Sequence, residues 1–109
     1  MIRVEYDRDA CVVRMTGHAG SAEPGRDLVC AAASILAFTI AENVIQLCDS
    51  GYAENCVVKL ESGDAEIGCS PHAKYESMIQ MVIDSICEGF GLLSSKYPDY
   101  ISFGLAGEG

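Results

Sequence analysis

The feature that most constrains the fold of this chain is a run of 21 residues, from Leu28 to Cys48, in which Glu42 is the only charged residue. Three consecutive alanines stand near its start and large apolar residues follow at close intervals, which predicts one long helix. A helix that is apolar nearly all round is expected to be buried on more than one side. In a chain of 109 residues, we therefore expect part of this helix to contact a second subunit.

A helix of this length is also long enough to span a membrane. The run contains more polar side chains than a lone transmembrane span usually carries, namely Ser34, Thr39, Glu42, Asn43 and Gln46. We therefore expect a buried helix and no membrane association. Half of the residues are hydrophobic, which suffices for a folded core, and the length predicts a single domain over residues 1–109.

Short alternating segments on both sides of the run predict a β-sheet. Ile2, Val4 and Tyr6 alternate with charged residues, as expected of a strand with one buried face. A turn at residues 7–9 leads to a second apolar segment, and a turn at residues 61–64 separates two more. The expected strands lie near residues 2–7, 10–16, 53–60, 65–69 and 99–103.

A second helix is expected after the second hairpin. Ser70 and Pro71 resemble an N-cap and a first-turn proline, and apolar residues follow at helical spacing, with Gly89 and Gly91 as points where the helix frays. Residues 104–109 are expected to be disordered. The order strand-strand-helix-strand-strand-helix-strand predicts an α+β fold. We expect a two-layer sandwich with both helices packed on a mainly antiparallel or mixed five-stranded sheet.

The charge of the chain limits its partners. The chain has sixteen acidic and seven basic residues, which gives a formal net charge of -9. Direct binding to nucleic acid is not expected, because its main attractive force comes from basic side chains that neutralise phosphates. A basic partner would be attracted instead.

The six cysteines raise the question of disulfides, because an even number in a small secreted protein predicts a disulfide framework. The N-terminus, however, alternates apolar and charged residues where an export signal would be a continuous apolar run. We therefore expect reduced thiols and a cytoplasmic protein.

One cysteine is placed differently from the others. Cys30 is expected to be the third residue of the long helix, with Asp27 as its N-cap. There the helix dipole and the free N–H groups favour a thiolate, and the same N–H groups form a site for an oxyanion. The cysteines expected only to fill the core are Cys11, Cys48, Cys56 and Cys87.

A nucleophilic cysteine needs a base, and the chain has two histidines. His18 stands at the start of a glycine-rich loop whose other end leads to Cys30, so the loop can bring the two together; an exposed histidine and a buried thiol are the alternative. His72 follows Cys69 at a spacing found in zinc sites, but no second close pair completes four ligands. We expect neither a metal nor a cofactor.

Two short motifs surround this histidine and this cysteine. They are Gly17-His18-Ala19 and Gly25-Arg26-Asp27-Leu28-Val29-Cys30-Ala31-Ala32-Ala33-Ser34. Their residues and separation resemble the ribosomal-processing cysteine protease family, Prp, and the expected element order fits that family over essentially the whole chain. This resemblance implies that Cys30 is the nucleophile and His18 its general base.

The resemblance also implies a substrate. The family removes an N-terminal extension from a large-subunit ribosomal protein, number twenty-seven, and cleaves after a pair of phenylalanines. Its members are homodimers, which agrees with the apolar character of the long helix. The acidic charge of the chain is suited to such a basic substrate.

The roles of the neighbouring residues are less direct. Asp27 either orients His18 or only caps the helix, and Ser34, one turn after Cys30, either supports the site or is a small packing residue. The loop is expected to close over the substrate, since glycine permits such movement. The residues assigned to this gate are Gly17, Ala19, Gly20 and Gly25.

Two other functions fit parts of the pattern. A non-catalytic dimeric adaptor would bind a basic ribosomal protein through its acidic surface. A thiol redox sensor would need a second cysteine close to Cys30, and none lies near it in sequence. Cleavage of a phenylalanine-pair peptide separates the protease from both.

Overall fold

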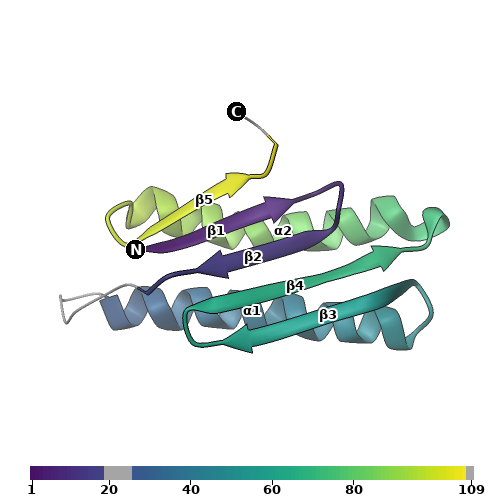
Figure 1. Ribbon diagram of the computed structural model, residues 1–109. Coiled ribbons are helices and arrows are strands. Elements are labelled where there is room, and N and C mark those ends of the chain that lie inside the picture. The colour runs from purple at the N-terminus through teal and green to yellow at the C-terminus, as the bar shows by residue number, and fades with distance from the viewer. Residues whose placement is uncertain (19–25, 108–109) are drawn as a thin grey trace.

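The computed structural model describes residues 1–18 and 26–107, with only the backbone of Arg26 and Asp27. Its elements follow the expected order (Figure 1). They are β1 (Ile2–Asp7), β2 (Val12–Thr16), α1 (Arg26–Asp49), β3 (Ala53–Glu61), β4 (Asp64–Pro71), a short 3-10 helix η1 (Ala73–Tyr75), α2 (Glu76–Lys96) and β5 (Ile101–Leu105).

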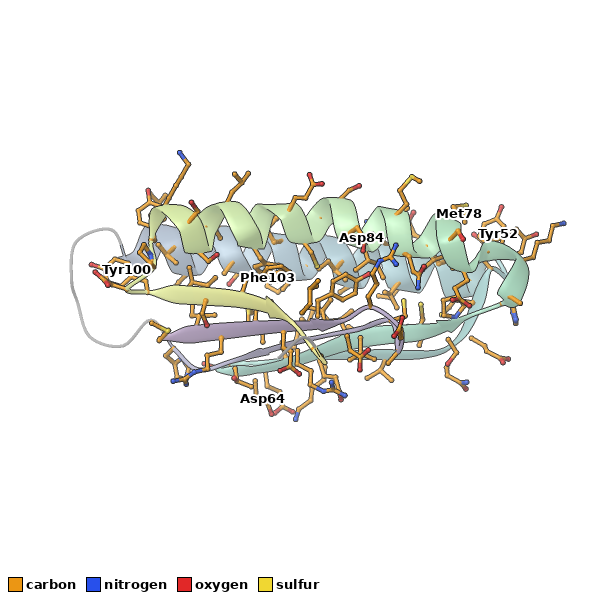
Figure 2. All side chains as sticks on the ribbon, turned by 90° about the horizontal axis from the view of Figure 1, so that it is seen from above. Tyr52, Asp64, Met78, Asp84, Tyr100 and Phe103 are labelled. Carbon is orange, nitrogen blue, oxygen red and sulfur yellow. The ribbon has the colours of Figure 1, made fainter. Side chains whose placement is uncertain are left out.

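The five strands form one mixed sheet in the order β3-β4-β2-β1-β5. All neighbouring pairs are antiparallel except β1 and β5, which are parallel. Figure 2 shows both helices on the same face of this sheet, α1 packing on β3 and β4 and α2 on β5. The prediction of a two-layer α+β sandwich is therefore confirmed.

The core lies between the sheet and the two helices. Along β1, the alternating residues Ile2, Val4 and Tyr6 point into it and are nearly completely buried. From the helices it receives large apolar side chains with no exposed surface, such as Ile40 and Phe90. The period of two in the strands and of about 3.6 in the helices thus places one apolar face of each element against the other layer.

Helix α1 is long and apolar enough to cross a membrane by length and composition alone. Within the fold, however, Val29, Ile40 and Val44 are completely buried against the sheet, as in a helix that packs inside a domain. Its opposite side leaves several large apolar residues exposed, namely Leu28, Ile35, Phe38 and Ile45. They are spaced by seven, three and seven residues and so lie on one helix face, which we call the exposed stripe.

The predicted start of the second helix was wrong. Ser70 and Pro71 belong to β4, where they pair with Glu54 and Ala53 of β3. Strand pairing therefore overrides a local pattern that is typical of a helix N-terminus. Helix α2 begins only at Glu76, and it continues without interruption to Lys96.

Two further expectations near the C-terminus need correction. Helix α2 does not fray at Gly89 or Gly91, both of which lie inside it. Gly104 and Leu105 are not disordered, because they form the end of β5 and pair with Glu5 and Tyr6 of β1. The last two residues, 108 and 109, lie outside the described part of the chain.

Candidate active site

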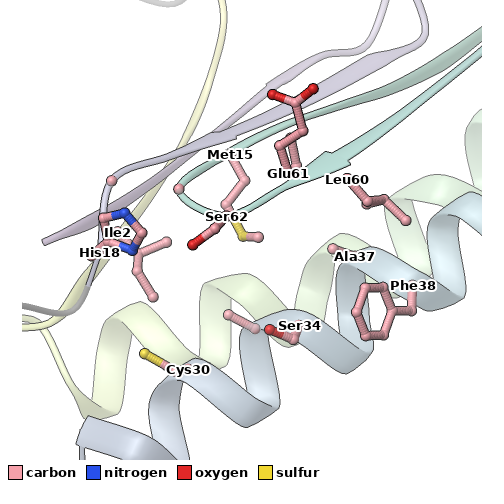
Figure 3. A pocket seen from close by; sticks show the side chains of 14 residues that line it. Ile2, Met15, His18, Cys30, Ser34, Ala37, Phe38, Leu60, Glu61 and Ser62 are labelled. Atoms are coloured by element: carbon pink, nitrogen blue, oxygen red, sulfur yellow. The ribbon is translucent and has the colours of Figure 1, made fainter.

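A pocket of about 330 Å³ lies at the end of the sheet where β1 begins, β2 ends and β3 turns into β4. Figure 3 shows α1 as one wall and the strand ends as the other. The helix contributes Cys30, Ala33, Ser34, Ala37 and Phe38. The strands and their connections contribute Ile2, Met15, Gly17, His18, Leu60, Glu61, Ser62, Gly63 and Ala65.

The helix wall exists because α1 carries small side chains at this level. Cys30, Ser34 and Ala37 are spaced by four and three residues, so they lie on the same face of the helix. Ala33 and Ala37 are buried beneath the pocket. Larger residues at these two positions would fill the space that the pocket occupies.

His18 reaches the pocket because the chain turns just after β2. Gly17 has a φ of +88°, a left-handed conformation that residues other than glycine rarely adopt. Its N–H donates a hydrogen bond to the carbonyl of Gly63, at 3.0 Å. The carbonyl of His18 accepts one from the Met1 nitrogen, at 2.7 Å. These two bonds hold the backbone on both sides of the imidazole.

The structure brings His18 and Cys30 into one pocket. In Figure 3 the imidazole and the thiol come from opposite walls and face a common space. No hydrogen bond joins the two side chains, although both belong to the described part of the chain. Catalytic hydrogen bonds are often long without substrate, so this geometry is compatible with a pair that closes on a bound carbonyl.

The position of Cys30 within its helix differs from the prediction. Helix α1 begins at Arg26, two residues earlier than expected, so Asp27 is its second residue and Cys30 its fifth. The N–H of a fifth residue lies within the helical hydrogen-bond ladder, and the free N–H groups belong to the preceding turn. The dipole therefore acts on Cys30 less strongly than at a third position.

Several assigned residues lie outside what the structure describes. Of the proposed gate, only Gly17 is described, and Ala19, Gly20 and Gly25 are not. The side chain of Asp27 is likewise outside the described atoms. Ser34 lines the pocket one turn after Cys30.

The remaining thiols are mostly unsuited to nucleophilic chemistry. Cys11 and Cys69 are buried with their Sγ atoms 3.8 Å apart, and this hydrogen bond together with burial raises the pKa of Cys69. Burial raises the pKa of Cys87 to about 12 and that of Cys48 to about 11. A raised pKa removes the thiolate that a nucleophile requires.

The expectation that Cys56 fills the core was wrong. Cys56 is exposed, because β3 is the edge strand of the sheet and most of its residues are open to solvent. The pairing of β3 with β4 is also irregular between Glu54 and Val57, where Asn55 has a φ of +54°. The alternation of buried and exposed residues is thereby lost.

The Cys69 and His72 pair forms no metal site. Cys69 is buried in β4, whereas His72 is exposed ahead of η1. Among the side chains that the structure describes, in residues 1–18 and 28–107, no group of three or more potential ligands gathers in one place.

The sequence does not indicate the part of the pocket that β3 and β4 contribute. It predicts only a strand end and a turn at Leu60, Glu61 and Ser62, all of which line the pocket. They line the same pocket as His18 because β4 pairs with β2, so that Asp64 lies opposite Thr16. Nothing in the local sequence signals this pairing.

The chain is similar to one protein family and to several solved structures. A family model described as "Cysteine protease Prp" matches residues 1–102. No curated protein matches the chain. Three solved structures share the fold. One is the essential ribosomal processing protease Prp of Staphylococcus aureus with a covalently linked product peptide. Its sequence is 21% identical, the match covers 96% of this chain and 99% of that one, and the TM-score is 0.67.

The other two structures give similar values. The same Staphylococcus aureus protease with a substrate peptide has 19% identity, with coverage of 95% of this chain and 96% of that one, and a TM-score of 0.69. A protein from Streptococcus mutans has 24% identity, with coverage of 95% and 90%, and a TM-score of 0.65. At these identities the likeness shows a common fold.

Proposed function

Because the chain belongs to the Prp family of cysteine proteases, we propose that it is an endopeptidase that removes the N-terminal extension of large-subunit ribosomal protein number twenty-seven. The observation that carries this proposal is that His18, Cys30 and Ser34 line one pocket, together with apolar side chains. A thiol and an imidazole that face a shared space are the groups that acyl transfer requires.

The shape and chemistry of the pocket support a peptide substrate with large apolar side chains. Ile2, Met15, Phe38 and Leu60 form its apolar walls, and its volume of about 330 Å³ falls in the range of small-ligand sites. The related Staphylococcus aureus protease has been crystallised with a substrate peptide and with a covalently linked product peptide. We propose that the pocket of this chain accepts the phenylalanines of its cleavage sequence.

In the proposed mechanism, His18 accepts the proton of the Cys30 thiol, and the thiolate attacks the carbonyl carbon of the scissile peptide bond. A C–S bond forms, and the charge that develops on the carbonyl oxygen is stabilised by free N–H groups in the first turn of α1. His18 then protonates the amine as the C–N bond breaks, which leaves a thioester on Cys30. Water activated by His18 attacks the thioester and releases the carboxylate product with the free thiol.

The assembly and location of the protein are part of the same proposal. The exposed stripe of α1, which contains Ile35, Phe38 and Ile45, would be covered in a homodimer. A net charge of -9 favours a basic ribosomal protein over nucleic acid. We place the protease in the cytoplasm, where ribosomal proteins are made.

A peptide that contains the phenylalanine pair tests this function. Wild-type protein is incubated with it under reducing conditions at neutral pH, alongside Cys30→Ala and His18→Ala, and the products are identified by mass spectrometry. Cys56→Ala and His72→Ala are the matched controls, since both remove an exposed side chain of the same kind outside the pocket.

We expect no cleavage by Cys30→Ala, and a loss of about 10²- to 10⁴-fold for His18→Ala, the usual contribution of a general base. The two controls should cleave like the wild type. A wild-type protein that binds the extended ribosomal protein but leaves it intact would support the acidic adaptor instead. Cleavage that survives in Cys30→Ala would refute the site.

A further inference from the structure

The turn between β3 and β4 lies directly beside His18. Thr16 at the end of β2 pairs with Asp64 at the start of β4. The residues that follow Thr16 therefore lie beside those that precede Asp64. The hydrogen bond from the Gly17 N–H to the Gly63 carbonyl continues this pairing by one step. A residue of the turn is thereby held next to the histidine, 45 positions away in the sequence.

A side chain at position 63 would collide with the His18 ring. A Cβ atom placed on Gly63 would overlap Nε2 of His18 and would stand 2.8 Å from Cε1 and 3.1 Å from Cδ2. Three ring atoms therefore lie within reach of a single methyl group, so the imidazole is packed against the backbone of Gly63. Real side chains do not tolerate contacts of this length, and the ring would have to move.

The imidazole has few other restraints. His18 is exposed, and among the described residues its ring makes no hydrogen bond, since the only bond at this residue is accepted by its backbone carbonyl. An exposed side chain without such a bond rotates freely unless a neighbouring surface limits it. Gly63, which lines the same pocket as Cys30, provides that surface.

We infer that Gly63 is a positioning residue of the active site, and that the absence of a side chain there allows the His18 ring to face Cys30. This inference rests on the proposed function, in which His18 is the base. Gly63 acts through His18 and exchanges no proton itself. A general base must stand within hydrogen-bond reach of its partner, so a displaced ring loses proton transfer even when the fold is intact.

A test must separate this contact from backbone strain. Gly63 has a φ of +74°, so any other L-residue there is strained whatever the space around it. Gly51 provides the matched control, because its φ is +82° and a Cβ there would meet no atom within 4 Å. Gly63→Ala and Gly51→Ala therefore share the strain, and only the first collides with His18. Gly63→Asn adds a residue that adopts the left-handed conformation more readily and carries the same Cβ.

The first measurement is the cleavage of the phenylalanine-pair peptide, with kcat and KM determined separately. We expect Gly63→Ala and Gly63→Asn to lower kcat by about tenfold or more, as loss of a general base predicts, with a smaller change in KM. Gly51→Ala should stay within about twofold of the wild type, although its melting temperature should fall as much as that of Gly63→Ala. A rise in KM alone would mean that the new side chain merely obstructs substrate, and would overturn the inference.

The second measurement needs no substrate. Because the chain has only two histidines, the ring signals of His18 and His72 can be resolved by NMR, with His72 as the internal reference. The His18 signals should shift in Gly63→Ala and remain unchanged in Gly51→Ala. Unmoved His18 signals, or an unchanged kcat in Gly63→Ala while His18→Ala is inactive, would overturn the inference. Cleavage by His18→Ala at the wild-type rate would instead refute the proposed function.

Discussion

The aromatic wall of the pocket allows a quantitative test of substrate recognition. Phe38 lies on α1 next to Ala37, and although it lines the pocket, 52% of its surface remains exposed. If the pocket receives a phenylalanine of the substrate, Phe38→Ala removes one aromatic contact. Such contacts contribute about 0.5 to 1.5 kcal/mol, which corresponds to a loss of about 2- to 12-fold in kcat/KM.

Phe38→Ala should leave the protein folded. Replacing a fully buried phenylalanine by alanine costs about 3 to 5 kcal/mol, and Phe38 is only half buried, so we expect the free energy of unfolding to fall by about 1.5 to 2.5 kcal/mol. Urea denaturation measures this value, and initial cleavage rates at several peptide concentrations measure kcat/KM. The effect on cleavage should therefore appear in protein that is still folded.

Ile35→Ala is the control for this experiment. Ile35 lies three residues earlier on the same exposed stripe, is 60% exposed and does not line the pocket. Any effect through the surface that the two residues share, including subunit contacts, should appear in both variants. An equal loss of kcat/KM in Ile35→Ala, or none in Phe38→Ala, would refute the assignment of Phe38 to the substrate pocket.

Three further predictions concern reactivity and stability. Iodoacetamide at pH 8 should label Cys30 and the exposed Cys56. Cys87 should stay unlabelled until the protein unfolds, because burial raises its pKa to about 12, and rapid labelling of Cys87 in native protein would contradict this. Phe90→Ala should lower the free energy of unfolding in urea by about 3 to 5 kcal/mol, because Phe90 is fully buried; a loss below about 1 kcal/mol would be inconsistent with this packing. Burial raises the pKa of the Tyr6 hydroxyl, so the folded state favours its neutral form. The free energy of unfolding should therefore fall as the pH rises above about 10. A Tyr6→Phe variant that loses as much stability as the wild type between pH 9 and 11 would exclude this cause.

The parts of the fold that depend on local pattern could be predicted from the sequence. The long helix follows from the run after Leu28, and the alternation of Ile2, Val4 and Tyr6 correctly indicates a strand with one buried face. These periodicities arise from residues close together in the chain. The order of the elements, and hence the two-layer architecture, could be predicted for the same reason.

Features that depend on distant pairing could not be predicted. Ser70 and Pro71 look like a helix start, and only their partners on β3 make them a strand. Cys56 looks like a core residue, and only the position of β3 at the sheet edge exposes it. The place of Gly63 beside His18 likewise depends on the pairing of β2 with β4.

The candidate site divides in the same way. The motifs around His18 and Cys30 indicate two groups that the structure places in one pocket. The opposite wall, with Leu60 and Ser62, comes from a hairpin with no such motif. Local signals therefore reveal the reactive groups, and the fold reveals what surrounds them.

In the proposed mechanism Cys30 carries the acyl group during cleavage, and this intermediate can be trapped. Wild-type protein is mixed with the phenylalanine-pair peptide, quenched in acid within the first turnover, digested and analysed by mass spectrometry. We expect a mass increase equal to the N-terminal product, as a thioester, on the fragment that contains Cys30. A thioester on another of the six cysteines, or efficient cleavage by Cys30→Ala, would contradict it.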